Sequence, residues 1–540
     1  MQRDQQLERL RSETFDVCVV GAGINGAVSA CVLAARGLRV ALIDRGDFGG
    51  ATSSQSSNLA WGGIKYLESG EVGLVWDLCD SRNELNDSYP STVREIRFLT
   101  TLERNFRKPA FVIYLGALLY WAFGRFKTRA PAYLSRAALK KREPLIDVRD
   151  AVAGVEYSDC YLHDNDSRFV WNFVRSALDR GAAAANYVAA NAFRRNDEGW
   201  EISARDEESG DSFDVRAKVL VNACGPWVDE VNSASKVSTD HRHVLSKGIH
   251  LVVDRMMNER RILAFFASDG RLFFVMPMGP KTCIGTTDTR VEDPLTGVTE
   301  EDRDFVLANA NELLDLKQTL TRDDIIAERC GVRPLAVTGS GSDSDWISLS
   351  RKHAIEVDES RAQISIFGGK ITDCINVGEE VADLVAGFGL SLQTESERWF
   401  GEPDANTRAR FFAEASDMNL DAMADARSME KLSKRFWRRY GADAFGMLDA
   451  IRKDPRMAER LVDEAEYLRC EIEHTADKEM ITRLEDFLRR RSKISLVVRA
   501  ESLENDPGLL ELCRVLFGDD AERRLQEYWR DNPVQAASKP

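Results

Sequence analysis

Three glycines and an aspartate near the start of the chain have the spacing of a dinucleotide-binding motif. Gly21, Gly23 and Gly26 form a Gly-x-Gly-x-x-Gly loop between an apolar run and an alanine-rich stretch, and Asp44 ends the next apolar run. Such glycines allow a tight turn, close approach of the backbone to a pyrophosphate and packing of a helix on a strand. A carboxylate at Asp44 can accept ribose hydroxyls but would repel a 2′-phosphate, so the motif favours FAD or NAD over NADP.

A loop of small hydroxyl side chains follows at residues 51–57. Its hydroxyls and backbone N–H groups could bind a pyrophosphate and the edge of a flavin. A flexible serine-rich loop would have the same composition, so both interpretations stay open.

Two further glycine motifs stand at the ends of apolar runs. Ala223 and Gly225 follow one run, at a point where a bulky side chain would clash with a nucleotide, and Gly368-Gly369 follow another. The helix expected after Gly368-Gly369 could face a flavin with its N-terminus, whose positive dipole end would stabilise the anionic reduced form. A simple turn is the alternative for this pair of glycines.

The hydrophobic pattern predicts the elements that position these residues. Residues 13–60 have the pattern of a βαβ unit, and residues 72–150 that of mainly helical structure. Four strand-like runs between residues 249 and 286, separated by turn signals, predict an antiparallel sheet. Beyond about residue 390 the charge density rises and the pattern is helical, so a domain boundary is expected there. Further elements are expected at residues 164–180 (helix), 217–221 (strand), 364–367 (strand) and 371–385 (helix).

The composition excludes several classes of function. The chain of 540 residues carries a formal net charge of −15, which argues against nucleic-acid binding, although a few converging cations could still bind an anionic substrate. The ten cysteines include no CxxC pair and the six histidines do not cluster, so no metal site is expected. Reduced, mostly buried thiols and an N-terminus without an apolar signal indicate a cytoplasmic protein.

One uncharged segment of fifteen residues, from Pro109 to Phe123, tests this assignment. It is shorter than the roughly 20 apolar residues that a spanning helix needs, so we expect a buried helix of the core. The alternative is an aromatic-rich helix that lies on a membrane surface. Basic residues flank the segment on both sides: Arg104, Arg107, Lys108, Arg125, Lys127 and Arg129.

The chain returns to nucleotide-fold strands only after the antiparallel sheet, which favours a two-domain flavoprotein over a nicotinamide enzyme. Several motifs, in order along nearly the whole chain, resemble those of the FAD-dependent glycerol-3-phosphate dehydrogenases. The resemblance implies bound FAD, and an α/β glutathione-reductase-like FAD-binding fold with an antiparallel substrate sheet (1–390), followed by an all-α C-terminal domain (391–540). The motifs are GAGINGAVSACVLAARGLRVALIDRGDFGGATSSQSSNLAWGGIKYLE, LVNACGPWVDEV, LSKGIH, FFVMPMGPKTCIGTTDT, CGVRPL, SIFGGKITD and YLRCEIEHTADKEMITRLEDFLRRRSK.

The resemblance favours flavin binding for the loop at residues 51–57, through Thr52, Ser53, Ser54 and Ser57.

The resemblance also implies a reaction and the residues that perform it. Lys65 and Tyr66 would lie near the substrate, while Arg333 and Lys370 would hold the oxygens of sn-glycerol 3-phosphate above the flavin and stabilise the developing alkoxide. The C2 hydroxyl would lose its proton, a hydride would pass from C2 to flavin N5, and electrons would continue to a quinone. His250 is the candidate base, and a histidine satisfied within the core is the alternative.

Three positions depart from the family pattern. Trp61 and Lys65 replace the histidine and the arginine of the family's HGGLRY motif, and lysine lacks the planar bidentate fork of arginine. Asp373, just after Gly-Gly-Lys, adds a negative charge close to where an anion should bind. Two alternatives therefore stay open: another small hydroxy or amino substrate on the same fold, or a flavin-binding sensor or scaffold without turnover.

Two basic stretches lie in the C-terminal part, at residues 431–441 and 487–493. We expect them on helix surfaces, balanced by acidic neighbours. Attraction to anionic lipid is the functional alternative, and it would make the protein peripheral on the cytoplasmic face of a membrane.

Overall fold

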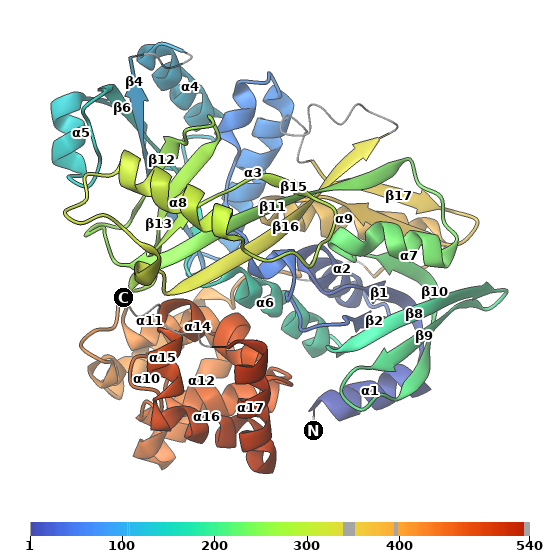
Figure 1. Ribbon diagram of the computed structural model, residues 1–540. Coiled ribbons are helices and arrows are strands. Elements are labelled where there is room, and N and C mark those ends of the chain that lie inside the picture. Colours follow the sequence, from blue (N-terminus) through green and yellow to red (C-terminus); the bar gives the residue numbers. More distant parts are fainter. Residues whose placement is uncertain (1, 105, 107, 339–351, 394–397, 534–540) are drawn as a thin grey trace.

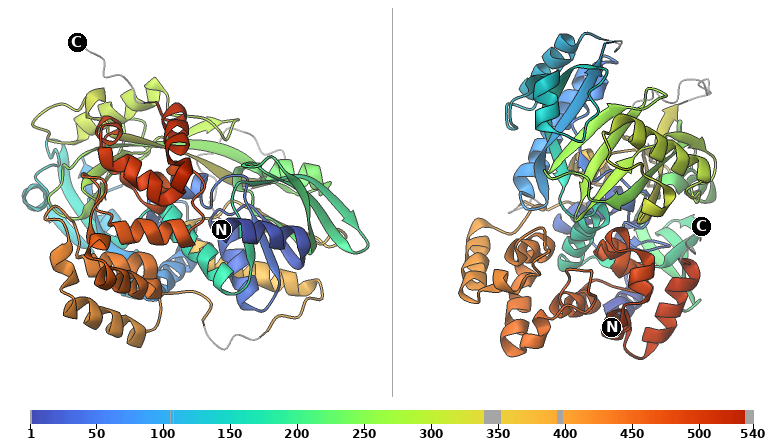
Figure 2. Two further views of the ribbon diagram at one scale, coloured as in Figure 1. Left: turned by 90° about the horizontal axis from the view of Figure 1, so that it is seen from below. Right: turned by 60° about the vertical axis from the view of Figure 1, so that its left-hand side comes forward.

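Two β-sheets and a group of C-terminal helices make up the chain (Figure 1). The computed structural model describes residues 2–104, 106, 108–338, 352–393 and 398–533. The C-terminal helices lie at the lower left in Figure 1, below the second sheet and beside the first, and Figure 2 shows them as a separate layer against the sheet-containing part. Eight of the ten cysteines are buried, as their scattered positions in apolar runs predict.

The first sheet contains the predicted nucleotide unit. Strand β1 (Thr14–Val20) pairs in parallel with β2 (Val40–Ile43) and β10 (Ser212–Asn222), and β10 pairs in parallel with β18 (Gln363–Phe367). Helix α2 (Ile24–Ala35) connects β1 to β2, so the βαβ prediction and the two later strands are confirmed. The sheet and its covering helices are completed by α1 (Gln2–Ser12), α6 (Asp166–Asp179), β7 (Ala183–Ala185), β8 (Val188–Asn196), β9 (Gly199–Asp206), α7 (Val228–Ser235), β17 (Ala354–Asp358) and α9 (Cys374–Gly387).

The second sheet contains the predicted antiparallel runs. Strands β11 (His241–Asp254), β14 (Lys281–Gly285), β13 (Leu272–Met278) and β12 (Arg261–Phe266) are neighbours in that order, and each is antiparallel to the next. Strand β16 (Ala327–Thr338) pairs with the other edge of β11 over most of its length. The remaining elements around this sheet are β3 (Leu59–Ala60), β15 (Thr289–Val291) and α8 (Glu300–Leu313).

The mainly helical prediction for residues 72–150 was wrong in part. A long strand, β4 (Val93–Glu103), pairs with β12 on one side and with β6 (Ala151–Leu162) on the other. Its sequence, VREIRFLTTLE, mixes β-branched and aromatic residues with charged ones, and pairing on both edges decides its conformation. The other elements of this region are α3 (Val72–Ser88), α4 (Ala110–Phe123), β5 (Ala132–Ser135) and α5 (Arg136–Arg142).

The C-terminal helices enclose two buried apolar clusters of their own. The expectation that both basic stretches lie on the surface was wrong, because Arg439 and Arg491 are only 1% and 0% exposed. Arg439 pairs with Asp164, and Arg491 pairs with Asp47. Buried opposite charges compensate one another, and these pairs join the C-terminal helices to the segments after β6 and β2. The helices are α10 (Ala405–Asp417), α11 (Leu432–Tyr440), α12 (Ala444–Lys453), α13 (Arg469–Lys478), α14 (Ile494–Val497), α15 (Ala500–Glu504), α16 (Pro507–Phe517) and α17 (Ala521–Asp531).

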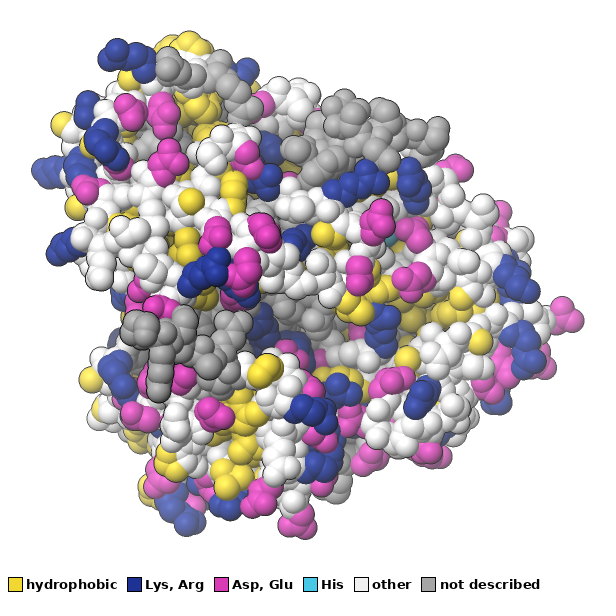
Figure 3. All heavy atoms as spheres, viewed as in Figure 1, with side chains coloured by type: hydrophobic (Ala, Val, Ile, Leu, Met, Phe, Trp, Pro, Cys, Tyr) yellow, Lys and Arg dark blue, Asp and Glu magenta, His cyan; other side chains and the backbone are white. Residues whose placement is uncertain are grey.

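Helix α4 is not the buried core helix that its apolar composition predicts. Only Ala117 and Tyr120 are buried, whereas Phe111 is 61% exposed and Leu119 is 47% exposed. Its apolar side chains gather at the top of the molecule (Figure 3). Within the described residues, no helix has the length and apolar character that crossing a membrane would require. Of the flanking basic residues, Arg107 lies outside the described part.

Candidate active site

The glycine loop lies where β1, β10 and the start of α2 meet. Gly21 has φ +95°, and a Cβ there would lie 2.6 Å from the carbonyl oxygen of Ala223. A Cβ on Gly26 would overlap the carbonyl oxygen of Gly21, and one on Gly23 would lie 3.2 Å from Ser53 Oγ. Side chains at these positions would separate helix from strand, so the loop has the close packing that a pyrophosphate-binding turn needs.

Asp44 lies beside this loop at the end of β2. Its carboxylate accepts hydrogen bonds from the backbone N–H groups of Ala22 (2.6 Å) and Gly46 (2.8 Å). Burial raises the pKa of Asp44 to about 6, although the two N–H donors act in the opposite direction. The sequence did not predict a second contact near this loop: the Arg45 guanidinium stacks 3.9 Å from the centre of the Trp227 ring.

The hydroxyl loop is bound to two of the elements that surround the glycine motif. Ser53 Oγ accepts a hydrogen bond from the N–H of Ile24 at the first turn of α2 (3.0 Å), and Thr52 donates to the carbonyl of Val332 on β16 (2.6 Å). The fourth candidate, Ser57, lies against β11, and Ser54 instead donates to the carbonyl oxygen of Ala51 within its own turn. The candidates therefore differ in what they can offer a ligand.

A buried arginine that the sequence reasoning missed holds the same loop in place. Arg329 is 1% exposed and donates to the carbonyl oxygen of Ser54 (2.8 Å) and to Asn58 Oδ1 (3.0 Å). It also forms an ion pair with Asp166 (3.1 Å). The sequence did contain a signal for this role, because Arg329 directly precedes the CGVRPL motif in a strand-like run. A charged side chain in a buried strand requires hydrogen-bonding or ionic partners.

The two glycines after β18 lie next to the first turn of α2. Gly368 and Gly369 have φ values of +65° and +104°, which favour glycine. Asn25 Nδ2 donates to the carbonyl of Gly368 (3.0 Å), and Gly225 across the site has φ +53°. Asn25 Oδ1 is buried without a hydrogen-bond partner among the residues that the structure describes. This orphaned acceptor, the glycine cradle and the acidic group at the end of β2 fit a bound dinucleotide.

Lys370 and Tyr66, both predicted to bind substrate, lie together. Lys370 Nζ is 4.2 Å from the centre of the Tyr66 ring, which is 8% exposed. Trp61 packs against the same ring with 6.2 Å between centroids, and its backbone N–H donates to Thr372 Oγ1 (2.9 Å). Lys65 is exposed, so the segment combines one buried ring with one exposed lysine.

Arg333 and His250 lie on the paired strands β16 and β11. Arg333 Nη2 donates to Thr286 Oγ1 (3.2 Å), and its Nη1 is 3.7 Å from Asp288 Oδ1. Its guanidinium lies where a Cβ on Gly248 would be. His250 is 1% exposed, and burial together with nearby arginines holds its pKa well below the usual range. The GTTDT motif contained Thr286 and Asp288, although sequence alone could not pair them with Arg333.

The negative charge of Asp373 is compensated by neighbouring side chains. Its carboxylate lies 2.6 Å from His353 Nδ1 and accepts hydrogen bonds from Ser81 (3.3 Å) and Asn376 (2.7 Å). Burial opposes ionisation, but these contacts, His353 foremost, hold the pKa of Asp373 below its ordinary value. The negative charge is therefore compensated beside α9, and it weighs less against an anionic substrate than the sequence indicates.

This chain matches two known protein families and is similar to several glycerol-3-phosphate dehydrogenases. Residues 16–347 match the family described as FAD dependent oxidoreductase, and residues 404–524 match the C-terminal domain of alpha-glycerophosphate oxidase. Glycerol-3-phosphate dehydrogenase 2 of Mycobacterium tuberculosis is 30% identical over 98% of this chain and 89% of its own length. The aerobic glycerol-3-phosphate dehydrogenase of Bacillus subtilis is 29% identical over 91% of this chain and 89% of its own.

One solved structure is similar over the whole chain. The glycerol-3-phosphate dehydrogenase from Bacillus halodurans complexed with FAD matches with a TM-score of 0.75 and 24% identity, and covers 100% of this chain and 99% of that one. Together with the family matches, this likeness confirms the expected α/β FAD-binding fold with a helical C-terminal domain.

Proposed function

The chain belongs to the FAD-dependent glycerol-3-phosphate dehydrogenase family, and on that premise we propose that it oxidises sn-glycerol 3-phosphate to dihydroxyacetone phosphate. The observation that carries the proposal is the grouping of Lys370 over Tyr66, together with Arg333 on a strand tied to the hydroxyl loop. A small phosphate-bearing substrate needs cationic donors of this kind. FAD is the cofactor of this family, and when bound it supplies the hydride acceptor.

The protein's own residues would bind and orient the substrate. Arg333 is held by Thr286 and Asp288, so its planar fork is preorganised and can bind substrate oxygens at little further entropic cost. Lys370 would add a second positive charge and stabilise the alkoxide that develops at C2. Lys65 and Tyr66 would contribute an accessible ammonium group and a phenol hydroxyl to the phosphate.

His250 is the proposed proton acceptor for the C2 hydroxyl. Its pKa lies well below the usual range, because the imidazole is buried and Arg329 and Arg333 are near, so it is neutral at physiological pH. A neutral imidazole has a nitrogen lone pair that can take a proton. The nearby cations that lower its basicity would equally lower the pKa of a bound hydroxyl.

Anaerobic mixing of the FAD-loaded protein with glycerol 3-phosphate tests the assignment. We expect loss of the oxidised flavin absorbance at millimolar substrate. Arg333→Ala should slow this by about 10²- to 10³-fold with FAD still bound, as expected when a preorganised donor is lost. Arg456→Ala, an exposed arginine paired with Asp454 far from the site, is the matched control.

An unchanged flavin spectrum in the unmodified protein would refute the substrate assignment. Trp61 and Lys65 make a different substrate the specific alternative, because both depart from the family motif beside the Tyr66 ring. Small hydroxy acids and amino acids therefore form the second panel of reductants, and bleaching by one of them alone would identify that alternative.

We further propose that the electrons pass to a quinone at a membrane surface, where α4 makes the contact. Phe111, Val112 and Leu115 are 61%, 45% and 46% exposed on this helix. Trp76 extends the apolar face, with its ring 5.5 Å from that of Phe123. Such an aromatic-rich face can lie in the interfacial region of a bilayer without spanning it.

The basic flanks of α4 contribute less than their number indicates. Arg125, Lys127 and Arg129 form ion pairs with nearby carboxylates, so their charge is partly compensated. The apolar face therefore has to supply most of the membrane affinity, and the interaction should depend only weakly on salt.

Flotation with phospholipid vesicles tests this contact. Phe111→Ser with Leu115→Ser should reduce vesicle binding and quinone reduction, and leave flavin reduction by substrate unchanged. Leu295→Ser removes an even more exposed leucine (74%) from a loop elsewhere and serves as the control. Equal vesicle binding of the two variants would refute the role of α4.

A further inference from the structure

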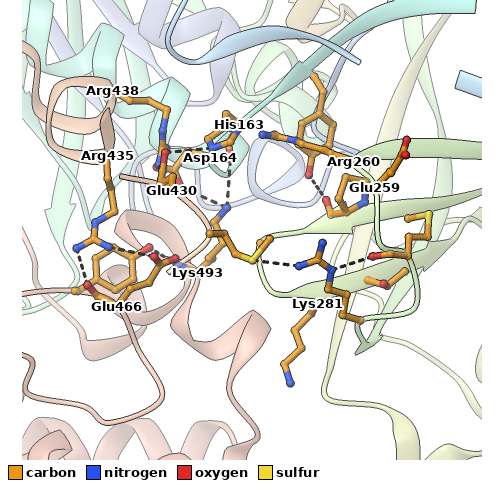
Figure 4. Close-up of a pocket in the computed structure, with 18 residues that line it drawn as sticks. His163, Asp164, Glu259, Arg260, Lys281, Glu430, Arg435, Arg438, Glu466 and Lys493 are labelled. Carbon is orange, nitrogen blue, oxygen red and sulfur yellow. Dashed lines mark hydrogen bonds and ion pairs between the residues drawn. The ribbon is translucent and has the colours of Figure 1, made fainter. Parts of the chain in front are cut away.

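A cavity of about 110 Å³ lies between the C-terminal helices and the second sheet (Figure 4). Residues 255–260, in the loop between β11 and β12, and Lys281 at the start of β14 form one side. Helix α11 and Lys493 form the other side, and His163 and Asp164 lie between them. Its volume holds several water molecules or one small polyatomic ion.

The side chains around the cavity are mostly charged, and the positive ones outnumber the negative ones. Six cationic side chains contribute to the walls: Arg255, Arg260, Lys281, Arg435, Arg438 and Lys493. Four carboxylates contribute: Asp164, Glu259, Glu430 and Glu466. The cavity is separate from the FAD-dependent site, because none of the residues assigned there contributes to its walls.

Each carboxylate of the cavity already has a close cationic partner. Asp164 pairs with Arg438 and with Arg439 (2.6 Å). Glu430 pairs with Arg438, and it lies 3.3 Å from His163 Nε2. The same holds for Glu466, which pairs with Arg435 (3.1 Å), and for Glu259, which pairs with Arg261. The negative charges of the walls are therefore compensated.

The cations are compensated less completely. Arg260 forms no hydrogen bond or ion pair with any residue in the described ranges, and its guanidinium carbon lies 5.6 Å from the centre of the Tyr161 ring. Arg255 donates to the carbonyl oxygens of Met257 and Asn258 instead of to a carboxylate. Lys493 Nζ is 3.8 Å from Asp164 Oδ1, and two arginines share that carboxylate. Arg255 and Arg260 thus lack a carboxylate partner among the described residues, and on the other side of the cavity Lys493 shares its carboxylate with two arginines.

Burial and neighbouring charges act on the pKa of both Lys493 and Arg260. Burial lowers the pKa of Lys493 and outweighs Asp164, which raises it; Arg438 adds to the lowering, and Glu430 and Glu466 oppose it. Arg260 is an exposed residue, but partial burial lowers the pKa of its guanidinium, with Arg94 and Arg438 contributing and Tyr161 and Glu430 opposing them. Burial disfavours the charged form of both groups, and an anion bound between them would favour it.

We propose that this cavity binds a small oxyanion, either free phosphate or the phosphate group of a small ester, with Arg260 and Lys493 as its principal ligands. Arg260 and Lys493 come from opposite sides of the cavity, so a bound oxyanion connects the second sheet to the C-terminal helices. The effect continues toward the FAD-dependent site, because Asn58, which directly follows the hydroxyl loop, donates to the carbonyl oxygen of Asp164 (2.7 Å). Ligand binding therefore stabilises the domain interface and, through it, that loop.

Equilibrium dialysis of the FAD-loaded protein with radiolabelled inorganic phosphate tests the proposal by counting sites. Arg260→Gln should bind one phosphate fewer per chain than Arg456→Gln, or bind it at least about tenfold more weakly, as expected for a lost charge-assisted hydrogen bond. Lys493→Met should give the same result and provides the second variant. Sulfate should compete, and chloride at equal ionic strength should not.

Equal numbers and affinities of phosphate sites in Arg260→Gln, Lys493→Met and Arg456→Gln would overturn the proposal, as would competition by chloride equal to that by sulfate. Methyl phosphate separates the two sources: displacement of labelled phosphate by it assigns the site to esters as well, and failure to displace restricts it to the free ion. The count does not depend on turnover, so it stands even if glycerol 3-phosphate fails to reduce the flavin.

Discussion

Ser57 Oγ lies 3.2 Å from His250 Nε2, and this contact joins the hydroxyl loop to the second sheet. Both residues were candidates from the sequence, one for the cofactor and one for catalysis, and they are 193 positions apart. The contact places the imidazole at the boundary between the two proposed sites. A neutral His250 can exchange hydrogen-bonding roles with the Ser57 hydroxyl, depending on its tautomer.

Replacing His250 should separate catalysis from cofactor binding. We expect His250→Asn to slow flavin reduction by glycerol 3-phosphate by about 10²- to 10⁴-fold, as for loss of a general base. Stopped-flow absorbance measures this rate, and the ratio of flavin to protein absorbance measures retained FAD. Ser57→Ala, which keeps the imidazole, should lose much less activity.

The pH dependence provides a second check on the same residue. Because the pKa of His250 lies well below its ordinary value, the group is deprotonated throughout pH 6 to 9, and its ionisation should leave no inflection in the reduction rate over that range. An inflection near pH 6.5 that disappears in His250→Asn would contradict this interpretation, and so would an undiminished rate in the variant.

The Tyr66 ring should matter to substrate affinity through its face as well as its hydroxyl. Tyr66→Phe removes only the hydroxyl, whereas Tyr66→Leu also removes the aromatic face that lies 4.2 Å from Lys370 Nζ. A cation–π contact of about 0.5 to 2 kcal/mol predicts that the KM of Tyr66→Leu is roughly 2- to 30-fold above that of Tyr66→Phe. Steady-state kinetics decides, and equal KM values would mean that the ring face does not position Lys370.

The glycine loop should tolerate no added methyl group. Gly26→Ala would overlap the carbonyl oxygen of Gly21, and we expect FAD affinity to fall roughly 10- to 100-fold, as for an overpacked site. Gly446→Ala is the matched control, since a Cβ there would contact nothing within 4 Å. Fluorescence titration of apoprotein with FAD compares the two, and normal affinity in Gly26→Ala would refute the packing role.

The sequence predicted the nucleotide unit well because its signals are local. The apolar runs, the glycine spacing and the alanine-rich helix all lie within about thirty residues, and the fold needs little else to define β1, α2 and β2. Strand β4 has no such local signal. Its partners β12 and β6 lie far along the chain, and pairing with both of them overrides the helical pattern around it.

Burial of charge was the least predictable feature. Arg439 and Arg491 belong to basic stretches that have the composition of surface helices, but their partners Asp164 and Asp47 are hundreds of residues away. The prediction for helix α4 was wrong in the opposite sense, because side chains expected to be buried are exposed. Hydropathy shows that Phe111 and Leu115 are apolar, but it does not show whether other parts of the protein cover them. Both errors arise from contacts that only the tertiary fold determines.

The cluster of His353, Asp373 and Glu380 should make stability depend on pH. His353 Nδ1 lies 2.6 Å from Asp373 Oδ2, and Nε2 lies 2.9 Å from Glu380 Oε2. Burial opposes protonation of His353, but the two carboxylates prevail and raise its pKa above the ordinary value. A pKa that is higher in the folded than in the unfolded state stabilises the protein fully below about pH 6.5, and the contribution is lost as pH rises through the folded value.

The carboxylate partner acts in the opposite range. The pKa of Asp373 is lowered in the folded protein, so its contribution is present above the ordinary carboxyl range and is lost as pH falls through the folded value. Of these two contributions to stability, only that of His353 changes between pH 6 and 9. We therefore expect the wild-type advantage in Tm over His353→Gln to shrink across this range, by the equivalent of about 1 kcal/mol.

Thermal denaturation of the FAD-loaded proteins, followed by flavin fluorescence at several pH values, measures this difference. Glu380→Gln removes only the more exposed of the two carboxylates and should give a smaller change, because Asp373 still holds the imidazolium. A wild-type advantage that grows with pH would reverse the sign, and would mean that burial outweighs both carboxylates and keeps His353 neutral.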